Sequence, residues 1–358
     1  MNKKRLIPNP YLHYEGAHIY NPLSDISVEI EQATADKLKR HRLSELADAE
    51  IDQCIDLGLL VPPDRAFGKE YRLKYVSIET HSVCNHSCYF CPVSVHERDR
   101  AFMQPPLFER ITEEIATKFS GIEGVFLNGY NEPTIDPNFI NFIKVLKNKS
   151  IAIAVNSNGS GLTPEVVDCL VDLGGLNYLC INLSTIDEHA FQTDRQASHL
   201  KPILRNLDYL GNTDIAQDLS IVVLGRDDDT HDQNHQAIID RFKGSRFEIK
   251  RFTVNDRSGR VNHFQRKQQP IKRLRGCEQT GSRPLQHLHI NAFGQCVLCC
   301  QDYYDEYVVG DLNSQSMAEV LEGPQMVQYR RWAYGIDEAP GDFICRQCEF
   351  ALSEPTSP

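Results

Sequence analysis

Residues 75–94 read "YVSIETHSVCNHSCYFCPVS", and this stretch joins two signals. Its first part, "YVSIETH" (75–81), is a short apolar run of the kind that forms a buried strand. Its second part holds three cysteines, Cys84, Cys88 and Cys91, in a C-x3-C-x2-C spacing. Because cysteine thiolates bind zinc and iron–sulfur clusters, the stretch indicates a metal site at the end of a strand.

The number of cysteines in this loop separates the two kinds of metal site. A structural zinc ion is closed by four protein ligands, and the sequence places no fourth cysteine near these three. Three cysteines suit a [4Fe–4S] cluster whose fourth iron stays open and can chelate a substrate or a cofactor. The alternative is a zinc ion completed by a more distant ligand, for example His81, His86 or His96. We favour the cluster.

The composition narrows the class of protein. The chain has 358 residues and a formal net charge of −11, which argues against binding along a nucleic-acid backbone. No stretch approaches the roughly 18 apolar residues of a membrane-spanning helix, and the N-terminal residues lack the apolar run of a signal peptide. Most cysteines are clustered like metal ligands, while Cys169 and Cys180 are expected to pack in the core. We therefore expect a cytoplasmic protein that contacts neither nucleic acid nor a membrane.

The middle of the chain alternates short apolar runs with amphipathic segments. This alternation is typical of a parallel sheet with helices between its strands, either open or curled into a barrel. Active sites of such sheets lie at the carboxyl ends of the strands, which is where the cysteine loop begins. Strands are expected at 75–81, 124–130, 151–159, 178–184, 218–225 and 247–254, and helices at 107–119, 137–148, 163–173, 199–210 and 233–243.

A C-x3-C-x2-C loop after the first strand of an α/β unit resembles the radical S-adenosylmethionine (radical SAM) superfamily. The resemblance implies a partial (β/α)6 TIM-like barrel, a [4Fe–4S] cluster on Cys84, Cys88 and Cys91, and S-adenosyl-L-methionine on the open iron. In this superfamily the reduced cluster cleaves the cofactor to a 5′-deoxyadenosyl radical, which abstracts a hydrogen atom from the substrate. The resemblance also implies an electron donor such as flavodoxin or ferredoxin.

Several strand ends resemble the cofactor-binding positions of this superfamily. The segment after the second strand resembles its Gly-Gly-Glu motif, in which a carboxylate holds the methionine amino group, although Asn131 replaces the last glycine. The third strand ends in an Asn-Gly pair, and the fourth carries two polar side chains on one face, where a ribose contact is found. The implied cofactor-binding residues are Phe90, Glu132, Asn158, Asn182 and Ser184. Ser184 is preferred to Asn182, and Glu132 could alternatively be a helix-start carboxylate.

The last 82 residues contain six further cysteines. Their order is one cysteine, then Gly-x-Cys in a hairpin sequence, then C-x2-C, which resembles the SPASM or Twitch extension of radical SAM enzymes. That extension implies an auxiliary [4Fe–4S] cluster, with zinc as the structural alternative. The implied ligands are Cys277, Cys296, Cys345 and Cys348. Cys299 and Cys300 depart from the pattern, and each could be a substitute ligand, a hydrogen donor or a packed thiol.

The sequence divides into three regions. Residues 1–70 contain a hairpin sequence, "HIYNPLSDISVEI" (18–30), and two short helical stretches that end at Gly58. This region resembles a small winged-helix-like element that captures a leader peptide by adding a strand to a sheet edge, and a structural cap on the barrel is the equal alternative. Residues 71–265 are expected to form the radical SAM core and residues 266–358 the cysteine-rich auxiliary-cluster domain.

Three functions are compatible with these regions. The first is a radical SAM enzyme that modifies a ribosomally made peptide, and the second is one that oxidises or deoxygenates a sugar or an aminocyclitol. Arginines near the last strands could clamp a substrate carboxylate or phosphate, namely Arg226, Arg251 and Arg257. Polar loops at 194–199, 225–232 and 255–260 could also face the substrate. The third function is a zinc-stabilised binding protein without enzymatic activity.

Overall fold

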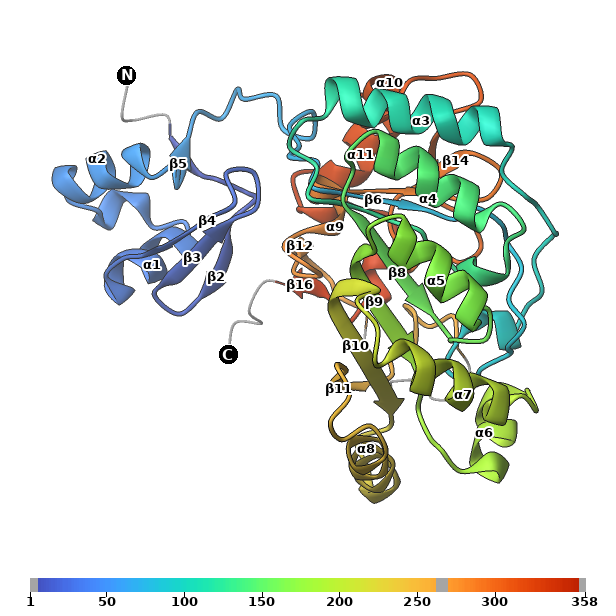
Figure 1. The fold of residues 1–358 in the computed structure, drawn as a ribbon. Coiled ribbons are helices and arrows are strands. Elements are labelled where there is room, and N and C mark those ends of the chain that lie inside the picture. Colours follow the sequence, from blue (N-terminus) through green and yellow to red (C-terminus); the bar gives the residue numbers. More distant parts are fainter. Residues whose placement is uncertain (1–5, 262–269, 354–358) are drawn as a thin grey trace. The chain divides into compact units, whose positions relative to one another are not determined.

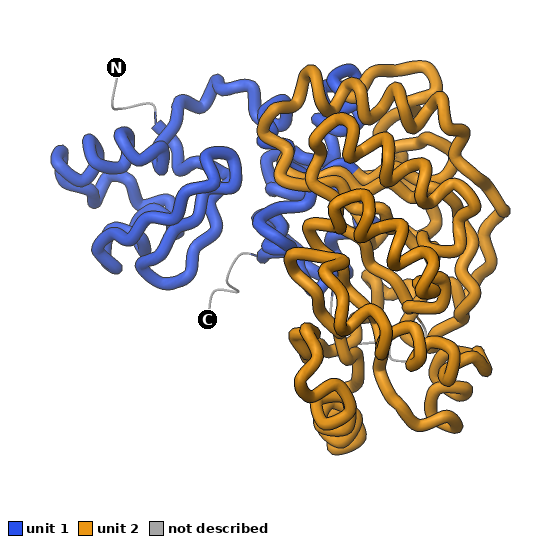
Figure 2. Tube along the Cα trace, viewed as in Figure 1, with its two compact units in different colours: residues 1–73, 268–288, 318–358 blue, residues 74–267, 289–317 orange. Residues whose placement is uncertain are grey.

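The computed structural model describes residues 6–261 and 270–353. The chain forms two compact units (Figure 2), which we call the barrel unit and the auxiliary unit. The barrel unit comprises residues 74–267 and 289–317, and the auxiliary unit comprises residues 1–73, 268–288 and 318–358. The expected boundary between residues 265 and 266 lies outside the described residues, and the division into three domains stays a prediction.

The barrel unit is built on six strands that lie side by side in chain order, and every neighbouring pair among them is parallel. The predicted α/β fold with a large, mostly parallel sheet is therefore confirmed. The strands are β6 (Tyr75–Ile78), β7 (Gly124–Phe126), β8 (Ile153–Ser157), β9 (Leu176–Asn182), β10 (Ala216–Gly225) and β11 (Glu248–Thr253).

Helices connect these strands, and α3, α4, α5 and α7 follow one another along the sheet (Figure 1). Each buries an apolar stripe at helical spacing, as α4 does with Phe142, Ile143 and Leu146. One helix of the unit, α6, was not expected from the sequence. The helices are α3 (Pro105–Lys118), α4 (Phe139–Asn148), α5 (Pro164–Asp172), α6 (Glu188–Arg195), α7 (Leu200–Leu210) and α8 (Asp229–Arg241), with 3-10 turns η3 (Pro92–Ser94) and η4 (Pro133–Ile135).

Three strands continue the sheet beyond β6 in the order β13, β14 and β15. Strands β13 (His287–Ile290) and β14 (Gln295–Val297) form the antiparallel hairpin that the sequence predicted, and β15 (Val308–Asp311) pairs antiparallel with β14. The turn contains Gly294 at φ +84°, a left-handed conformation that glycine adopts without strain. The hairpin places Cys296 in the sheet and Cys299 and Cys300 just after it.

The first part of the auxiliary unit is a small α/β element. The predicted hairpin is formed by β3 (His18–Asn21) and β4 (Ile26–Glu29), and β2 (His13–Glu15) completes an antiparallel sheet of order β2-β3-β4. Ile19 of the sheet packs in one core with Leu38 and Cys54 of the helices. The other elements are β1 (Ile7–Pro8), α1 (Gln32–Lys39), η2 (Leu43–Glu45), α2 (Asp48–Asp56) and β5 (Leu60–Val61). Its winged-helix-like identity stays a prediction.

The rest of the auxiliary unit is short elements and loops. Arg330 of α11 is fully buried and donates to the carbonyl oxygens of Gly68, Pro284 and Leu321 at 2.8–3.1 Å, so one side chain joins three segments. The elements are β12 (Leu274–Cys277), α9 (Arg283–Gln286), α10 (Met317–Leu321), α11 (Pro324–Ala333), η6 (Ile344–Gln347) and β16 (Ala351–Ser353). Across the described parts of both units, no helix has the length and apolarity needed to cross a membrane.

Candidate active site

The cysteine loop, residues 84–91, starts just beyond β6 and is held by helix α6. The backbone N–H groups of Ser87 and Tyr89 donate to the carbonyl oxygens of Arg195 and Asp194, both at 2.9 Å. These carbonyls lie at the C-terminal end of α6, where a helix leaves its last carbonyls without partners inside the helix. Helix α6 therefore fixes the backbone of the loop that carries the three predicted cluster ligands.

Two thiols of this loop, Cys84 and Cys91, lie where a negative charge is unfavourable. Burial raises the pKa of Cys84 to about 12 and that of Cys91 to about 11. The charges of Glu132 and of the neighbouring cysteines raise the pKa of Cys84 further. A bound metal cluster reverses this balance, because thiolates bind metal in place of their protons. The loop therefore suits thiolates that carry a metal.

One of the possible zinc ligands near the loop, His86, has another histidine as its neighbour. Within residues 6–261 and 270–353, no three His, Cys, Asp or Glu side chains converge as a single metal ion requires. The Nε2 of His86 instead lies 2.8 Å from Nε2 of His199.

Arg195, at the end of α6, joins four residues that the sequence singled out. Its Nη1 donates to Sγ of Cys88 at 3.4 Å, and its Nη2 donates to Oδ1 of Asn182 at 2.7 Å and to Oγ of Ser184 at 2.5 Å. Its Cζ lies 4.7 Å from the ring centroid of Phe90, a cation–π contact. The two predicted ribose contacts thus hold an arginine, which the sequence analysis included only as part of the polar loop 194–199.

Arg195 also provides a test of whether the residues fit the expected cofactor. The side chain is buried, and its Nε has no hydrogen-bond partner among the described residues. An unpaired buried donor destabilises a protein by about 1–3 kcal/mol. The methionine part of S-adenosyl-L-methionine carries a carboxylate that can accept from such a donor beside Cys88. The surroundings of Cys88 therefore fit this cofactor.

Glu132 is buried and receives hydrogen bonds on both carboxylate oxygens. Its Oε1 accepts from the N–H and the hydroxyl of Thr134, at 3.2 and 2.5 Å, and from Oγ of Ser157 at 2.7 Å. Its Oε2 accepts from the N–H of Asn158 at 2.5 Å. Burial raises the pKa of Glu132, and these hydrogen bonds act in the opposite direction. Glu132 thus caps η4, as the simpler hypothesis held, and is also a fixed carboxylate that can receive an ammonium group.

Asn158 connects the end of β8 to the cysteine loop. Its Nδ2 donates to Oδ1 of Asn85 at 2.8 Å, and its Oδ1 accepts from the N–H of Ser160 at 2.9 Å. Asn85 in turn donates through Nδ2 to Oγ of Ser160 at 2.9 Å. Because Asn85 lies between the first two cysteines, Asn158 positions the loop, and its contact with the cofactor stays a prediction.

A second group of side chains lies beside Cys91, and we call it the Tyr130 group. Glu79 and Arg98 form a bidentate ion pair with distances of 3.1 and 2.5 Å. The Arg98 guanidinium lies over the rings of Tyr130 and Tyr303, 5.5 and 5.0 Å from their centroids. Burial raises the pKa of both tyrosines, and the nearby charge of Cys91 adds to this effect. The group therefore lies next to the predicted cluster.

The two cysteines that the sequence left open belong to the Tyr130 group. The hydroxyl of Tyr130 donates to the carbonyl oxygen of Cys300 at 2.5 Å. The charges of Cys299 and Cys300 contribute, after burial, to the raised pKa of Tyr130. Sγ of Cys299 accepts from the N–H of Gln301 at 3.4 Å. Cys91, Cys299 and Cys300 thus all lie near Tyr130. The spacing of the cysteines along the sequence did not predict this proximity.

The three arginines near the last strands have different partners. Arg251 is held by two aspartates in ion pairs of 2.7 and 3.0 Å. Arg226 lies over the ring of Tyr89, 4.8 Å from its centroid. Arg257 lies over the ring of Tyr130, 5.9 Å from its centroid. Of these three, Arg257 is therefore the one that joins the Tyr130 group.

Three of the four predicted auxiliary ligands come together in the auxiliary unit. Strand β12 pairs with β16 so that Cys277 lies opposite Ala351, three residues after Cys348. Burial raises the pKa of Cys345 well above its usual value, and the charges of Cys348 and Cys277 add to it. Cys296 belongs to the barrel unit, where it is fully buried on β14. Its place among the auxiliary ligands stays a prediction.

All twelve cysteines are described, and none forms a disulfide. The expectation that Cys169 packs in the core is wrong, because the buried stripe of α5 runs through Val167 and Leu170 and leaves Cys169 exposed. Cys180 on β9 is buried, as expected.

Comparison with known families agrees with this arrangement. Residues 78–236 match the radical SAM superfamily, from β6 through the cysteine loop and Arg195. These residues form a radical SAM domain. Residues 277–349 match SPASM, an iron–sulfur cluster-binding domain, from Cys277 through the C-x2-C pair. Both predicted assignments are confirmed, and they imply a [4Fe–4S] cluster, S-adenosyl-L-methionine and further iron–sulfur binding.

Two curated relatives resemble parts of this radical SAM chain. It is 31% identical over 102 residues to the tungsten-containing aldehyde ferredoxin oxidoreductase cofactor-modifying protein of Pyrococcus furiosus, a match that covers 28% of each chain. It is 29% identical over 104 residues to the S-adenosyl-L-methionine-dependent 2-deoxy-scyllo-inosamine dehydrogenase of Niallia circulans, covering 28% of this chain and 40% of the dehydrogenase. The chain thus spans less than half the length of these relatives.

Two solved structures share the fold of this radical SAM chain. Streptococcus suis SuiB, bound to its precursor peptide SuiA, has a TM-score of 0.59 and 12% identity, covering 91% of this chain and 90% of SuiB. BtrN, in complex with AdoMet and 2-DOIA, has a TM-score of 0.51 and 15% identity, covering 78% of this chain and 98% of BtrN. At these identities the likeness concerns the fold alone.

Proposed function

We propose that this radical SAM enzyme modifies a ribosomally made peptide. The cluster and S-adenosyl-L-methionine, when bound, supply the 5′-deoxyadenosyl radical that abstracts a hydrogen atom from the substrate. The observation that supports a peptide as the substrate is the open edge of strand β4 in the auxiliary unit. We also propose flavodoxin or ferredoxin as the electron donor.

In this proposal the residues of the barrel unit bind and orient the cofactor. The three cysteines of the loop hold the cluster, and α6 holds the loop. When the cofactor is bound, Glu132 would accept from the methionine ammonium and Nε of Arg195 would donate to the methionine carboxylate, so that an anion and a cation would hold the two charged groups of the methionine. Asn182 and Ser184 accept from Arg195 and keep its guanidinium in place.

The edge of β4 suits strand addition by a peptide. Among the described residues β4 pairs on one side only, with β3. The N–H of Ile30 donates to the carbonyl oxygen of Ala17, so in the antiparallel ladder the N–H groups of Ser27 and Glu29 point toward the open edge. Ile26 is 55% exposed on the same strand. An extended peptide can pair with this edge and cover that side chain.

The extent of the structural likeness also favours a peptide. The likeness to SuiB covers 91% of this chain, so it has to include part of the first 73 residues, whereas the likeness to BtrN covers 78%. SuiB was solved with a precursor peptide bound. We therefore assign to residues 1–70 of this chain the capture of a leader peptide.

The alternative is the oxidation of an aminocyclitol-type molecule. It is favoured by the 29% identity to the 2-deoxy-scyllo-inosamine dehydrogenase of Niallia circulans. In the Tyr130 group, Arg98 and Glu79 are charged groups that can bind the hydroxyl and amino groups of such a molecule. This alternative assigns no role to the edge of β4.

The test compares the two substrates with iron-loaded enzyme under anaerobic conditions. Short peptides encoded beside the gene and 2-deoxy-scyllo-inosamine are each added with S-adenosyl-L-methionine and dithionite. The formation of 5′-deoxyadenosine and the mass of the added substrate are measured. We expect one peptide to raise 5′-deoxyadenosine formation and to change its own mass.

A proline variant connects this result to β4. Ser27→Pro removes an outward N–H without breaking a bond to β3, while Ser27→Ala keeps the N–H. We expect Ser27→Pro to raise the KM for the peptide by about tenfold or more and Ser27→Ala to leave it unchanged. Equal KM values for both variants would show that the peptide does not pair with the edge of β4. Turnover of the aminocyclitol, with no peptide modified, would replace the proposal by the alternative.

A further inference from the structure

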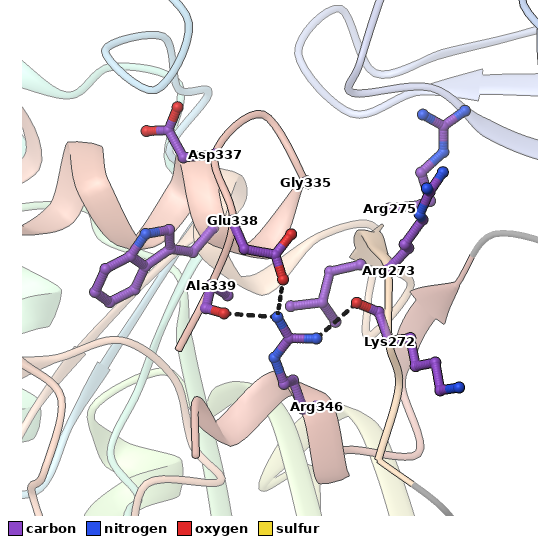
Figure 3. A pocket seen from close by; sticks show the side chains of 10 residues that line it. Lys272, Arg273, Arg275, Gly335, Asp337, Glu338, Ala339 and Arg346 are labelled. Atoms are coloured by element: carbon purple, nitrogen blue, oxygen red, sulfur yellow. Dashed lines mark hydrogen bonds and ion pairs between the residues drawn. The ribbon is translucent and has the colours of Figure 1, made fainter. Parts of the chain in front are cut away.

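A cavity of about 260 Å³ opens in the auxiliary unit (Figure 3). Its walls come from residues 272–275 at the start of β12, from residues 335–339 after α11, and from the side chains of Trp332 and Arg346. Figure 3 shows the Arg346 guanidinium directed at Glu338 on one side and at the backbone of Lys272 on the other. The cavity thus lies entirely within one unit.

The lining of this cavity is basic. Four of its side chains are basic and two are acidic. Both acidic groups have cationic partners within the protein: Asp337 pairs with Arg331 at 2.6 Å, and Glu338 pairs with Arg346 at 2.8 Å. Arg346 also donates to four backbone carbonyl oxygens, which fix it in the wall.

The other three basic side chains come from one short segment. Lys272 and Arg273 are exposed, and Arg275 is half-buried with its Nη2 3.3 Å from Nε2 of His41. Arg273 and Arg275 extend to one side and Lys272 to the other (Figure 3), and both arginines also have interaction partners within the protein. In a chain with a net charge of −11, three basic residues within this short segment are a local concentration of positive charge.

The chain segments that supply two of these walls also carry predicted auxiliary ligands, although the cavity lining itself contains no cysteine. Arg275 lies two residues before Cys277 on β12, and Arg346 lies between Cys345 and Cys348. These cysteines lie close together, because β12 pairs with β16. The charges of Cys277 and Cys348 also add to the raised pKa of Cys345. A molecule bound in the cavity therefore contacts both segments that hold predicted cluster ligands.

We propose that this basic cavity docks an acidic one-electron carrier protein beside the auxiliary cysteines. The proposal rests on the proposed function, since it takes those cysteines to hold an iron–sulfur cluster. The overall negative charge of the chain repels an acidic carrier, so such a partner needs a local basic surface to approach. Trp332 adds an aromatic side chain at the site, and tryptophan and arginine are the residues on which protein interfaces most depend.

The place of the cavity favours a carrier over an acidic peptide. Basic side chains increase the binding affinity of an acidic peptide wherever they lie on the protein surface. The rate of electron transfer falls with the distance between the two redox centres. A redox partner therefore also benefits from binding beside the segments that hold the predicted cluster ligands, whereas a peptide does not. Exposed Lys272 and Arg273 extend the positive charge beyond the cavity itself, where charge steers the approach of a protein partner.

The test measures the binding of a purified acidic flavodoxin to the iron-loaded full chain by calorimetry under anaerobic conditions. The variant is Lys272→Glu/Arg273→Glu, whose side chains are exposed, so the fold should persist. A matched control is Lys39→Glu/Arg40→Glu, which makes the same charge change on exposed residues of the same unit. We expect the first variant to weaken the Kd at least about tenfold and the control to change it less than about twofold.

Two further measurements locate the carrier. Carbodiimide cross-linking joins carboxylates to lysines, and we expect mass spectrometry to find flavodoxin linked to Lys272. A Kd that the first variant leaves unchanged, or a cross-link confined to other lysines, overturns the proposal. So does a short polyglutamate peptide that binds as tightly as flavodoxin and competes with it, because the site is then one for acidic peptides. Dithionite-driven cleavage of S-adenosyl-L-methionine by the wild-type chain tests the proposed function separately, since it needs no carrier.

Discussion

Replacing Arg195 by methionine tests how the cofactor is held. Methionine retains an unbranched apolar stem and removes the guanidinium that donates to Cys88, Asn182 and Ser184. It also removes the buried Nε that has no partner among the described residues and that we assign to the methionine carboxylate of the cofactor. The variant should therefore weaken the binding of S-adenosyl-L-methionine.

The size of this effect follows from the bonds that are lost. A hydrogen bond from a charged donor contributes about 1.5–3 kcal/mol, which corresponds to a roughly 10- to 150-fold weaker Kd for the cofactor. The acceptors on Asn182 and Ser184 also lose their donor, which at about 1–3 kcal/mol for each acceptor lowers the free energy of unfolding by about 2–6 kcal/mol in all. Since that loss could unfold the chain, Arg195→Lys serves as a second variant that keeps the charge and loses the Nε donor.

The assay is calorimetric titration of S-adenosyl-L-methionine into iron-loaded chain, with iron content and thermal unfolding measured on each variant. We expect Arg195→Lys to bind the cofactor more weakly than wild type and Arg195→Met to bind it most weakly. Folded, iron-loaded variants that bind the cofactor within about twofold of wild type would refute the reasoning. Arg195 would then serve only to hold helix α6 against the cysteine loop.

Four other predictions follow from the same contacts. Changing all three cysteines of the loop to alanine should abolish cleavage of S-adenosyl-L-methionine, measured as 5′-deoxyadenosine, and cleavage by that variant would remove the cluster assignment. Cys345→Ala with Cys348→Ala should lower iron by about four atoms per chain and spare the first cluster, and unchanged iron would remove the auxiliary cluster. Gly161→Ala should lower the free energy of unfolding in urea by about 1–3 kcal/mol, because its Cβ would lie 2.5 Å from the carbonyl oxygen of Thr134, whereas Gly121→Ala, with open space around it, should not. Iron loading should increase from pH 7 to pH 9. Burial raises the pKa of Cys91 to about 11 and that of Cys84 to about 12, and iron must displace the protons of these thiols. Iron loading that does not depend on pH would contradict these pKa values.

The strands of the barrel could be predicted because each is a short apolar run between helical stretches. Two polar side chains on the fourth strand could also be placed on one face, since strand side chains alternate with a period of two. The structure shows Asn182 and Ser184 accepting from the same Nη2 of Arg195. Their partner could not be predicted, because it arrives from a helix 11 residues further along the chain than Ser184.

Helix α6 was missed because its sequence lacks an apolar stripe. Between residues 188 and 195 the one large apolar side chain is Phe191, so a helical period cannot be recognised. The available signal was Asp187, whose side chain accepts from the N–H of Ala190 and caps the helix. The sequence predicted only that residues 194–199, which include Arg195, form a polar loop that could face the substrate. A fully buried arginine is rare, and only the contacts of Arg195 with Phe90 and the cysteine loop reveal its place.

The N-terminal hairpin shows a different limit. The hairpin sequence at residues 18–30 predicted the pairing of β3 and β4, and the structure has that pairing. Whether a peptide adds to β4 depends on a molecule outside the chain, so no local pattern contains it. The same holds for Cys299 and Cys300, whose spacing fits a ligand, a hydrogen donor or a packed thiol equally well.

The central claim is that this chain carries two iron–sulfur clusters, one on the cysteine loop and one on the SPASM cysteines. The most direct test measures iron, sulfide and zinc per chain on anaerobically purified and reconstituted protein. The account predicts about eight irons, about eight sulfides and little zinc, the sum of two four-iron clusters. Zinc with almost no iron would contradict it and favour a zinc-stabilised binding protein.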